Sequence, residues 1–181
     1  LLIWLRDLMK KQQKCLALKR KTEKPYYTIL RTLEKGVEIR EYDSHIRAST
    51  QMGQENRSFG VLAEYIFGRN DHEEKIGMTA PVITSRDKMS FIMPSRYSLE
   101  NLPKPLNSQI EIAQEGPQKM AVLRFSGFSS PAKNEKKINE MLEVLKNHGI
   151  KIEGEAFLMR YNPPWTLPPL RRNEVAVNVN L

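Results

Sequence analysis

Residues 59–66 read Phe-Gly-Val-Leu-Ala-Glu-Tyr-Ile, and their apolar side chains recur with the period of an α-helix. Residues at positions i, i+3, i+4 and i+7 lie on one side of a helix, so this spacing predicts a helix with one apolar face. The face is formed by Phe59, Leu62, Ala63 and Ile66. Gly68 follows, and glycine readily takes the left-handed conformation that ends many helices. We therefore predict a helix over residues 56–68.

Strand patterns lie on both sides of this helix. The strands expected in this half of the chain are residues 27–33, 37–42, 45–52, 76–84 and 88–93. They are rich in β-branched and aromatic residues or alternate apolar and polar side chains with period two. Glu34-Lys35-Gly36 has turn chemistry, which predicts a hairpin between the first two strands. The polar Ser85-Arg86-Asp87 joins the last two.

The second half of the chain repeats this plan. An apolar stripe with the same spacing lies 79 residues later, at Ile138, Met141, Leu142 and Leu145. Ser130 is a favoured N-cap and Pro131 a favoured first helical residue, which predicts a helix over residues 131–148. The strands expected here are residues 109–113 and 119–125, paired as a hairpin, and then residues 156–161 and 174–179.

The order of elements predicts an α+β fold made of two tandem ββαββ units. Two such antiparallel units have strand edges that can pair with each other. We therefore expect one domain over residues 25–181, in which a curved antiparallel sheet or distorted barrel carries both helices. An N-terminal basic amphipathic helix would precede it.

The net charge of +8 is concentrated in residues 1–24. That segment holds eight basic and two acidic residues, whereas residues 25–181 carry only +2. The body of the chain thus lacks the one-sided basic field that binds phosphate backbones, so we expect no nucleic-acid partner. The single cysteine, Cys15, cannot form an intramolecular disulfide. No apolar run approaches the length of a membrane span, so we expect a soluble, cytoplasmic chain.

Residues 1–24 form a separate arm whose role stays open. Leu1, Leu5, Leu8 and Met9 would share one side of a helix, with basic residues around the rest. The arm could pack on the domain or on a neighbouring chain, or contact a membrane surface. Because the sequence starts at Leu1, it could also be the end of a longer targeting or anchoring segment. We expect the arm to be dispensable for the fold of residues 25–181.

No catalytic motif is present in the sequence. A Gly-x-Ser-x-Gly elbow, a Gly-Lys-Ser/Thr phosphate loop and a His-Glu-x-x-His zinc helix are all missing. His45, His72 and His148 stand far apart on different elements, so we predict no metal site. We expect His45 to be an exposed residue after the Asp43-Ser44 turn. The sequence therefore favours a binding protein over an enzyme.

Four segments have sequences that are unusual for ordinary strands and turns and that resemble a known protein family. They are Glu-Lys-Ile-Gly-Met-Thr-Ala-Pro-Val at 74–82, Phe-Ile-Met-Pro at 91–94, Phe-Ser-Gly-Phe at 125–128, and the proline-rich block at 160–175. Neither strand propensity nor turn chemistry requires the Pro-Pro-Trp-Thr-Leu-Pro-Pro-Leu-Arg-Arg-Asn-Glu run within that block. Together these segments resemble the SOUL heme-binding family from about residue 27 to residue 179. Only the arm lies outside the match.

The resemblance implies non-enzymatic binding of heme, or of a metal-free porphyrin, against the first helix. A porphyrin is a flat apolar disc with two carboxylates at one edge, and needs an apolar wall and a basic rim. The wall would be Phe59, Leu62, Ala63 and Ile66, and the candidate partners of the propionates are Arg57, Lys75, Arg171 and Arg172. The apolar stripe could instead be ordinary core, and the two adjacent arginines could instead pair with Glu174.

Iron ligation is where this chain departs from the family pattern. Some members carry a histidine directly after the Glu-Ile-Arg of the second strand, and this chain has Glu41 there. A carboxylate is a much poorer ligand of heme iron than imidazole. Heme binding is therefore expected to depend on the apolar wall and the propionates.

Two other classes of function stay open. The chain could bind another apolar small molecule, or a protein or membrane partner through residues 1–24. It could also be a hydrolase on the same fold, for which Glu153, Glu155 and Tyr161 are the candidate acid and base residues.

Overall fold

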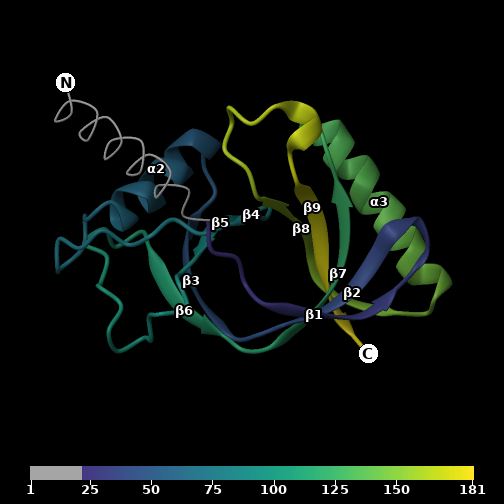
Figure 1. Cartoon of the computed structure of the whole chain (residues 1–181), viewed down its shortest axis with the longest axis horizontal. Helices are drawn as coiled ribbons and strands as arrows, with labels where there is room; N and C mark the ends of the chain where they lie inside the picture. Colours follow the sequence, from purple (N-terminus) through teal and green to yellow (C-terminus); the bar gives the residue numbers. More distant parts are fainter. Residues whose placement is uncertain (1–21) are drawn as a thin grey trace, which may run out of the picture.

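The computed structural model describes residues 22–181, so the predicted amphipathic helix of the arm lies outside the described residues. Nine strands form a single antiparallel sheet, ordered β1-β2-β7-β9-β8-β4-β5-β3-β6. Figure 1 shows this sheet curled, with α2 over one half and α3 over the other. The predicted α+β fold, with one curved sheet and two helices, is confirmed.

Both predicted helices and most predicted strands are present, with ends shifted by a few residues. The first half contains β1 (Tyr27–Thr32), η1 (Glu34–Gly36), β2 (Val37–Tyr42), β3 (His45–Gln51), α2 (Glu55–Ile66), β4 (Val82–Thr84) and β5 (Lys88–Ile92). The second half contains β6 (Glu111–Glu115), β7 (Gln118–Phe125), α3 (Pro131–Asn147), β8 (Lys151–Arg160), η2 (Pro168–Leu170) and β9 (Asn173–Asn180). Ser130 caps α3, its hydroxyl accepting from the Lys133 amide at 3.4 Å.

The two ββαββ units exchange their first strands. The first unit consists of β2, β3, α2, β4 and β5, and the second consists of β6, β7, α3, β8 and β9. The first strand of the first unit, β2, pairs with β7, and the first strand of the second unit, β6, pairs with β3. The units also meet at the middle of the sheet, where β4 pairs with β8. Each unit therefore keeps three of its strands together, β4-β5-β3 or β7-β9-β8, and gives its first strand to the other unit.

This exchange corrects the predicted hairpin between residues 109–113 and 119–125. The corresponding strands, β6 and β7, lie at different places in the sheet and do not pair with each other. A glycine and a proline between two strands indicate a reversal of the chain, but they do not select the partner of either strand. The partners are selected by burial of the two unit edges against each other.

The predicted strand over residues 76–84 was too long, because only Val82–Thr84 joins the sheet. Residues 76–80 bond instead to three other elements. The Ile76 amide donates to the Ile66 carbonyl at the end of α2, the Thr79 hydroxyl donates to the Ile92 carbonyl, and the Ala80 amide donates to the Glu23 carbonyl. Pro81 follows, and its nitrogen has no proton to donate to a ladder.

Three apolar clusters hold the domain together. One lies between α3 and strands β2, β7, β8 and β9, and a second lies between α2, strands β3 and β5 and residues 102–110. The third lies on the other face of the sheet, inside the curl, and includes Tyr42, Ile83, Met120, Val122 and Met159. Both faces of the central strands are thus buried, which explains their nearly continuous apolar sequences.

The structure describes the last residues of the predicted arm, 22–24. The Glu23 carboxylate accepts from the Ser95 amide at 2.7 Å, and the Lys24 ammonium lies 5.7 Å from the centre of the Tyr161 ring. Glu23 and Lys24 therefore contact the domain, although they belong to the predicted arm. No helix within residues 22–181 is long and apolar enough to cross a bilayer.

Candidate functional site

Three of the four apolar residues predicted to face a ligand on α2 are buried in the core. Leu62 and Ile66 are 0% and 1% exposed and pack against β3 and β5, and Ala63 is 9% exposed. Phe59 is 40% exposed, and its ring meets the edge of Phe91 at 5.3 Å between centroids. The stripe is therefore mainly a core seam, and Phe59 lies at its solvent edge.

A second row of residues on α2 has an exposed aromatic ring at each end, and the sequence pattern did not predict the ring at its C-terminal end. Phe59, Ala63 and Phe67 follow each other at intervals of four residues, and Phe67 is 66% exposed. The backbones of Phe59 and Phe67 are about 12 Å apart along the helix axis, from a rise of about 1.5 Å per residue. The small residues Gly60 and Ala63 lie between them, and the exposed Glu64, paired with Arg69, borders this surface.

Two of the predicted basic residues lie near the ends of this helix. Arg57 is exposed in the first turn of α2, and Lys75 is exposed beside Ile76, whose amide bonds to the last residue of the helix at 2.8 Å. Within residues 22–181, no carboxylate forms an ion pair with either of them. Both cations are thus available to an anionic group on the surface of α2.

Arg171 and Arg172 have partners within the protein. Arg171 donates to the Thr166 carbonyl at 2.7 Å and to the Pro164 carbonyl, and its guanidinium lies 5.0 Å from the Phe128 ring centroid. Arg172 donates to the Glu174 carboxylate at 2.9 Å and lies over the Tyr161 ring at 4.0 Å. The structure therefore gives both arginines structural contacts, and it does not bring them to α2.

A network of paired charges fills the inner face of the α3 half. Glu174 is fully buried and accepts from both Arg40 and Arg172, and Arg40 is 3% exposed. Burial alone would lower the pKa of the Arg40 guanidinium, but the Glu174 carboxylate more than reverses this and raises it. Burial also raises the pKa of Tyr161, so its hydroxyl is protonated. Aromatic rings and paired charges thus occupy the space where a ligand could otherwise enter the curl.

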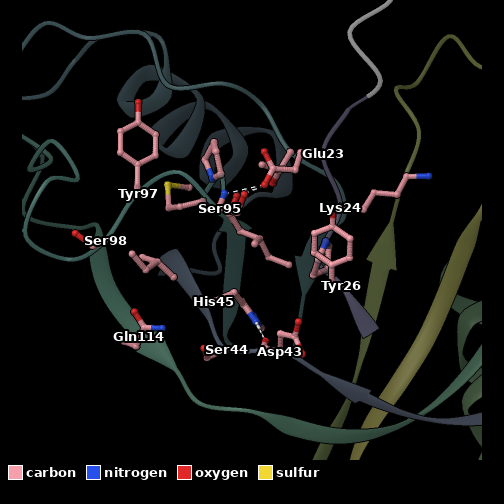
Figure 2. A pocket seen from close by; sticks show the side chains of 16 residues that line it. Glu23, Lys24, Tyr26, Asp43, Ser44, His45, Ser95, Tyr97, Ser98 and Gln114 are labelled. Atoms are coloured by element: carbon pink, nitrogen blue, oxygen red, sulfur yellow. Dashed lines mark hydrogen bonds between the residues drawn. The ribbon is translucent and has the colours of Figure 1, made fainter. Parts of the chain in front are cut away.

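A cavity of about 360 Å³ lies beside residues 23–26. Figure 2 shows the side chains around it, which come from residues 23–26, the turn between β2 and β3, and residues 92–98. Its lining mixes polar groups such as Ser44, Tyr97 and Gln114 with Ile92 and Met93. A second hollow inside the curl, beside Arg47 and Phe157, has only about 190 Å³ and is too small to enclose a macrocycle.

His45 lines the cavity of Figure 2 and is half-buried, which corrects the expectation that it is exposed. Its Nδ1 lies 3.0 Å from the Asp43 carbonyl oxygen, so we assign the proton to Nδ1. Nε2 is buried and has no partner among residues 22–181. Burial lowers the pKa of this imidazole, although the Asp43 bond opposes the shift.

Glu41, at the position where some family members carry a histidine, lies away from α2. It belongs to β2, which pairs with β1 and β7, whereas α2 packs on β3 and β5. Glu41 lines an open hollow with Lys119 and Glu153 near the C-terminus. Glu153 and Glu155 are exposed and Tyr161 is buried inside the curl, so the three candidate hydrolase residues are not gathered in one site.

The fold and this surface define a small α+β domain with an apolar, basic-flanked helix face. Solved structures of similar fold include the EcmrR C-terminal domain, with a TM-score of 0.58 and 10% identity over 85% of this chain and 98% of that one. A hydrolase from Listeria innocua gives a TM-score of 0.50 and 11% identity over 94% and 98%. At these identities the likeness concerns the fold alone.

The sequence comparisons are more specific. The model of the SOUL heme-binding protein family matches residues 22–178, and the chain belongs to this family. Heme-binding protein 2 of Homo sapiens is 29% identical over 162 residues, covering 83% of this chain and 74% of that protein. Heme-binding protein 2 of Mus musculus is 30% identical over 129 residues, covering 65% and 62%. Membership supports heme binding at the level of the family.

Proposed function

We propose that this chain binds heme or a related tetrapyrrole on the outer face of α2 and acts as a non-enzymatic carrier or buffer. The observation that carries the proposal is the pair of solvent-exposed aromatic rings of Phe59 and Phe67, on either side of the small residue Ala63, in a member of a heme-binding family. A flat macrocycle would lie on the small residues Gly60 and Ala63, between the two rings. Arg57 and Lys75 would contact the propionates.

The proposal assigns different roles to the predicted site residues. Phe59 and Ala63 contact the ligand, whereas Leu62 and Ile66 hold the helix on the sheet. Arg57 and Lys75 offer charge-assisted hydrogen bonds to carboxylates. Arg171 and Arg172 support the proline-rich loop and the interior network, and do not contact the ligand.

A heme titration followed by Soret absorbance tests this proposal. Phe67→Ser removes an apolar ring from the proposed wall. A macrocycle covering roughly 60 Å² of that ring would gain about 1.5 kcal/mol, so the variant is expected to bind heme about tenfold more weakly. Phe128→Ser is the matched control, because Phe128 is 64% exposed, Phe67 is 66% exposed, and Phe128 lies on the loop before α3.

The basic rim is tested in the same assay. Arg57→Gln and Lys75→Gln are each expected to weaken heme binding severalfold, whereas Lys119→Gln, an exposed change in the α3 half, should leave it unchanged. Equal affinities of Phe67→Ser and Phe128→Ser, with the rim variants also unchanged, would show that the ligand does not lie on α2.

A further inference from the structure

The loop between β8 and β9 is held in one conformation by its own hydrogen bonds. The Thr166 amide donates to the Pro163 carbonyl at 3.0 Å, and Arg171 donates to two carbonyls of the same loop. The loop is also tied to residues 126–128, because the Gly127 amide donates to the Pro168 carbonyl at 2.9 Å. Four prolines between residues 163 and 169 stiffen it further.

This stiff loop presents large apolar side chains to solvent. The residues and their exposed fractions are Trp165, 84%; Leu167, 66%; Leu170, 70%; and Phe128, 64%. We call these four residues the loop patch. Figure 1 shows the loop projecting beyond the ends of the strands, between α2 and α3. The apolar side chains therefore lie on a projecting loop. Their apolar surface is in contact with water, and only a binding partner could bury it.

The sequence on both sides of the loop patch lacks acidic residues, and the carboxylates that approach the ends of the loop, Glu55 and Glu174, are paired with Arg160 and Arg172. Residues 116–134 and 156–173 contain no aspartate or glutamate. The cations nearest the patch are Arg171, stacked on Phe128, and Lys133, whose ammonium donates to the Ser126 carbonyl at 2.7 Å. Lys24, in the first described residues, lies against Tyr161 at the start of the loop. Residues 1–24 carry a net charge of +6.

We propose that the loop patch is a docking surface for a bilayer that contains anionic phospholipid. Tryptophan has an apolar body and a polar N–H, which suits it to the boundary between headgroups and acyl chains. Leucine side chains on a rigid projection enter that boundary without a cost of ordering the loop. The flanking sequence without acidic residues and the net charge of +6 in residues 1–24 match a negative surface, which attracts nearby Lys and Arg residues. A protein partner would be expected to bury the patch in a pocket of its own and has no need of this charge pattern.

The test uses the full chain with Trp4→Phe, which leaves Trp165 as the only tryptophan. Vesicles of phosphatidylcholine with 30% phosphatidylserine, about a third anionic lipid as in a strongly negative leaflet, are compared with phosphatidylcholine alone. The anionic vesicles should shift the Trp165 emission to shorter wavelength, and brominated lipid should quench it. Binding should weaken at high salt, since screening shortens the reach of the charges.

Matched variants separate the loop patch from the arm. Measured by co-sedimentation with the same vesicles, Trp165→Ala with Leu167→Ala should weaken binding at least tenfold, whereas Leu99→Ala with Leu106→Ala, which removes two exposed leucines elsewhere, should not change it. Vesicle binding without any change in Trp165 emission would overturn the proposal, because the arm alone would then explain it. A blue shift that grows with protein concentration in the absence of lipid would overturn it in favour of a protein contact, and no vesicle binding at all would also overturn it.

Discussion

Glu174→Gln perturbs the buried charge network with almost no change in shape. Glu174 is fully buried, and its two oxygens accept from Arg40 at 3.1 and 3.2 Å and from Arg172 at 2.9 Å. Glutamine keeps one oxygen as an acceptor but removes the charge that balances two guanidinium groups. Leaving one partner of a buried ion pair uncompensated costs about 3–5 kcal/mol.

The lower end of this range applies here, because Arg40 also contacts the half-buried Glu38 at 2.7 Å. A loss of about 3 kcal/mol should lower the Tm by about 6–12 °C in a chain of this size. Urea unfolding at constant m-value would measure the free energy, and adding Arg40→Met to Glu174→Gln should cost less than the two changes separately. Glu111→Gln, which breaks the exposed Lys88 pair, is the control and should leave the Tm unchanged. A loss below about 1 kcal/mol for Glu174→Gln would refute the reasoning.

Two further predictions concern the first residues and His45. Deleting residues 1–21 should leave the Tm unchanged. Deleting residues 1–24 should lower the Tm by a few degrees, because the hydrogen bonds of Glu23 to Ala80 and Ser95 are lost. Equal Tm values for the two deletions would contradict this prediction. Because burial lowers the pKa of His45 in the folded state, the unfolded state binds its proton first, and stability should fall as the pH drops below about 6.5. His45→Gln should show a smaller fall in Tm between pH 7 and pH 5, and an identical fall would show that His45 is not involved.

Local sequence patterns predicted the helices well because their signals are local. The α2 prediction, residues 56–68, compares with 55–66 in the structure, and the α3 prediction, 131–148, compares with 131–147. Strand pairing was harder. Nothing within β6 or β7 indicates that they pair with β3 and β2, since that choice depends on how two distant edges are buried together.

The candidate site shows the same division between local and distant information. The spacing of Phe59, Leu62, Ala63 and Ile66 predicted one apolar face of a helix. It did not indicate which of these side chains the sheet would bury and which would stay exposed to solvent. Extending the interval of four residues from Phe59 and Ala63 would have found Phe67. The partner of Arg172 was suggested by Glu174 two residues later, whereas the bonds of Arg171 depend on the shape of the loop.

Comparing heme with iron-free protoporphyrin on the unmodified chain tests the central claim most directly. If the apolar face of α2 and its basic rim provide the affinity, fluorescence and Soret titrations should give dissociation constants within about tenfold of each other, a difference of roughly 1.4 kcal/mol. The opposite result would be heme bound far more tightly than the porphyrin, with a six-coordinate low-spin spectrum that His45→Ala or His72→Ala abolishes. That result would place the ligand at a histidine and contradict binding on the Phe59, Ala63 and Phe67 row.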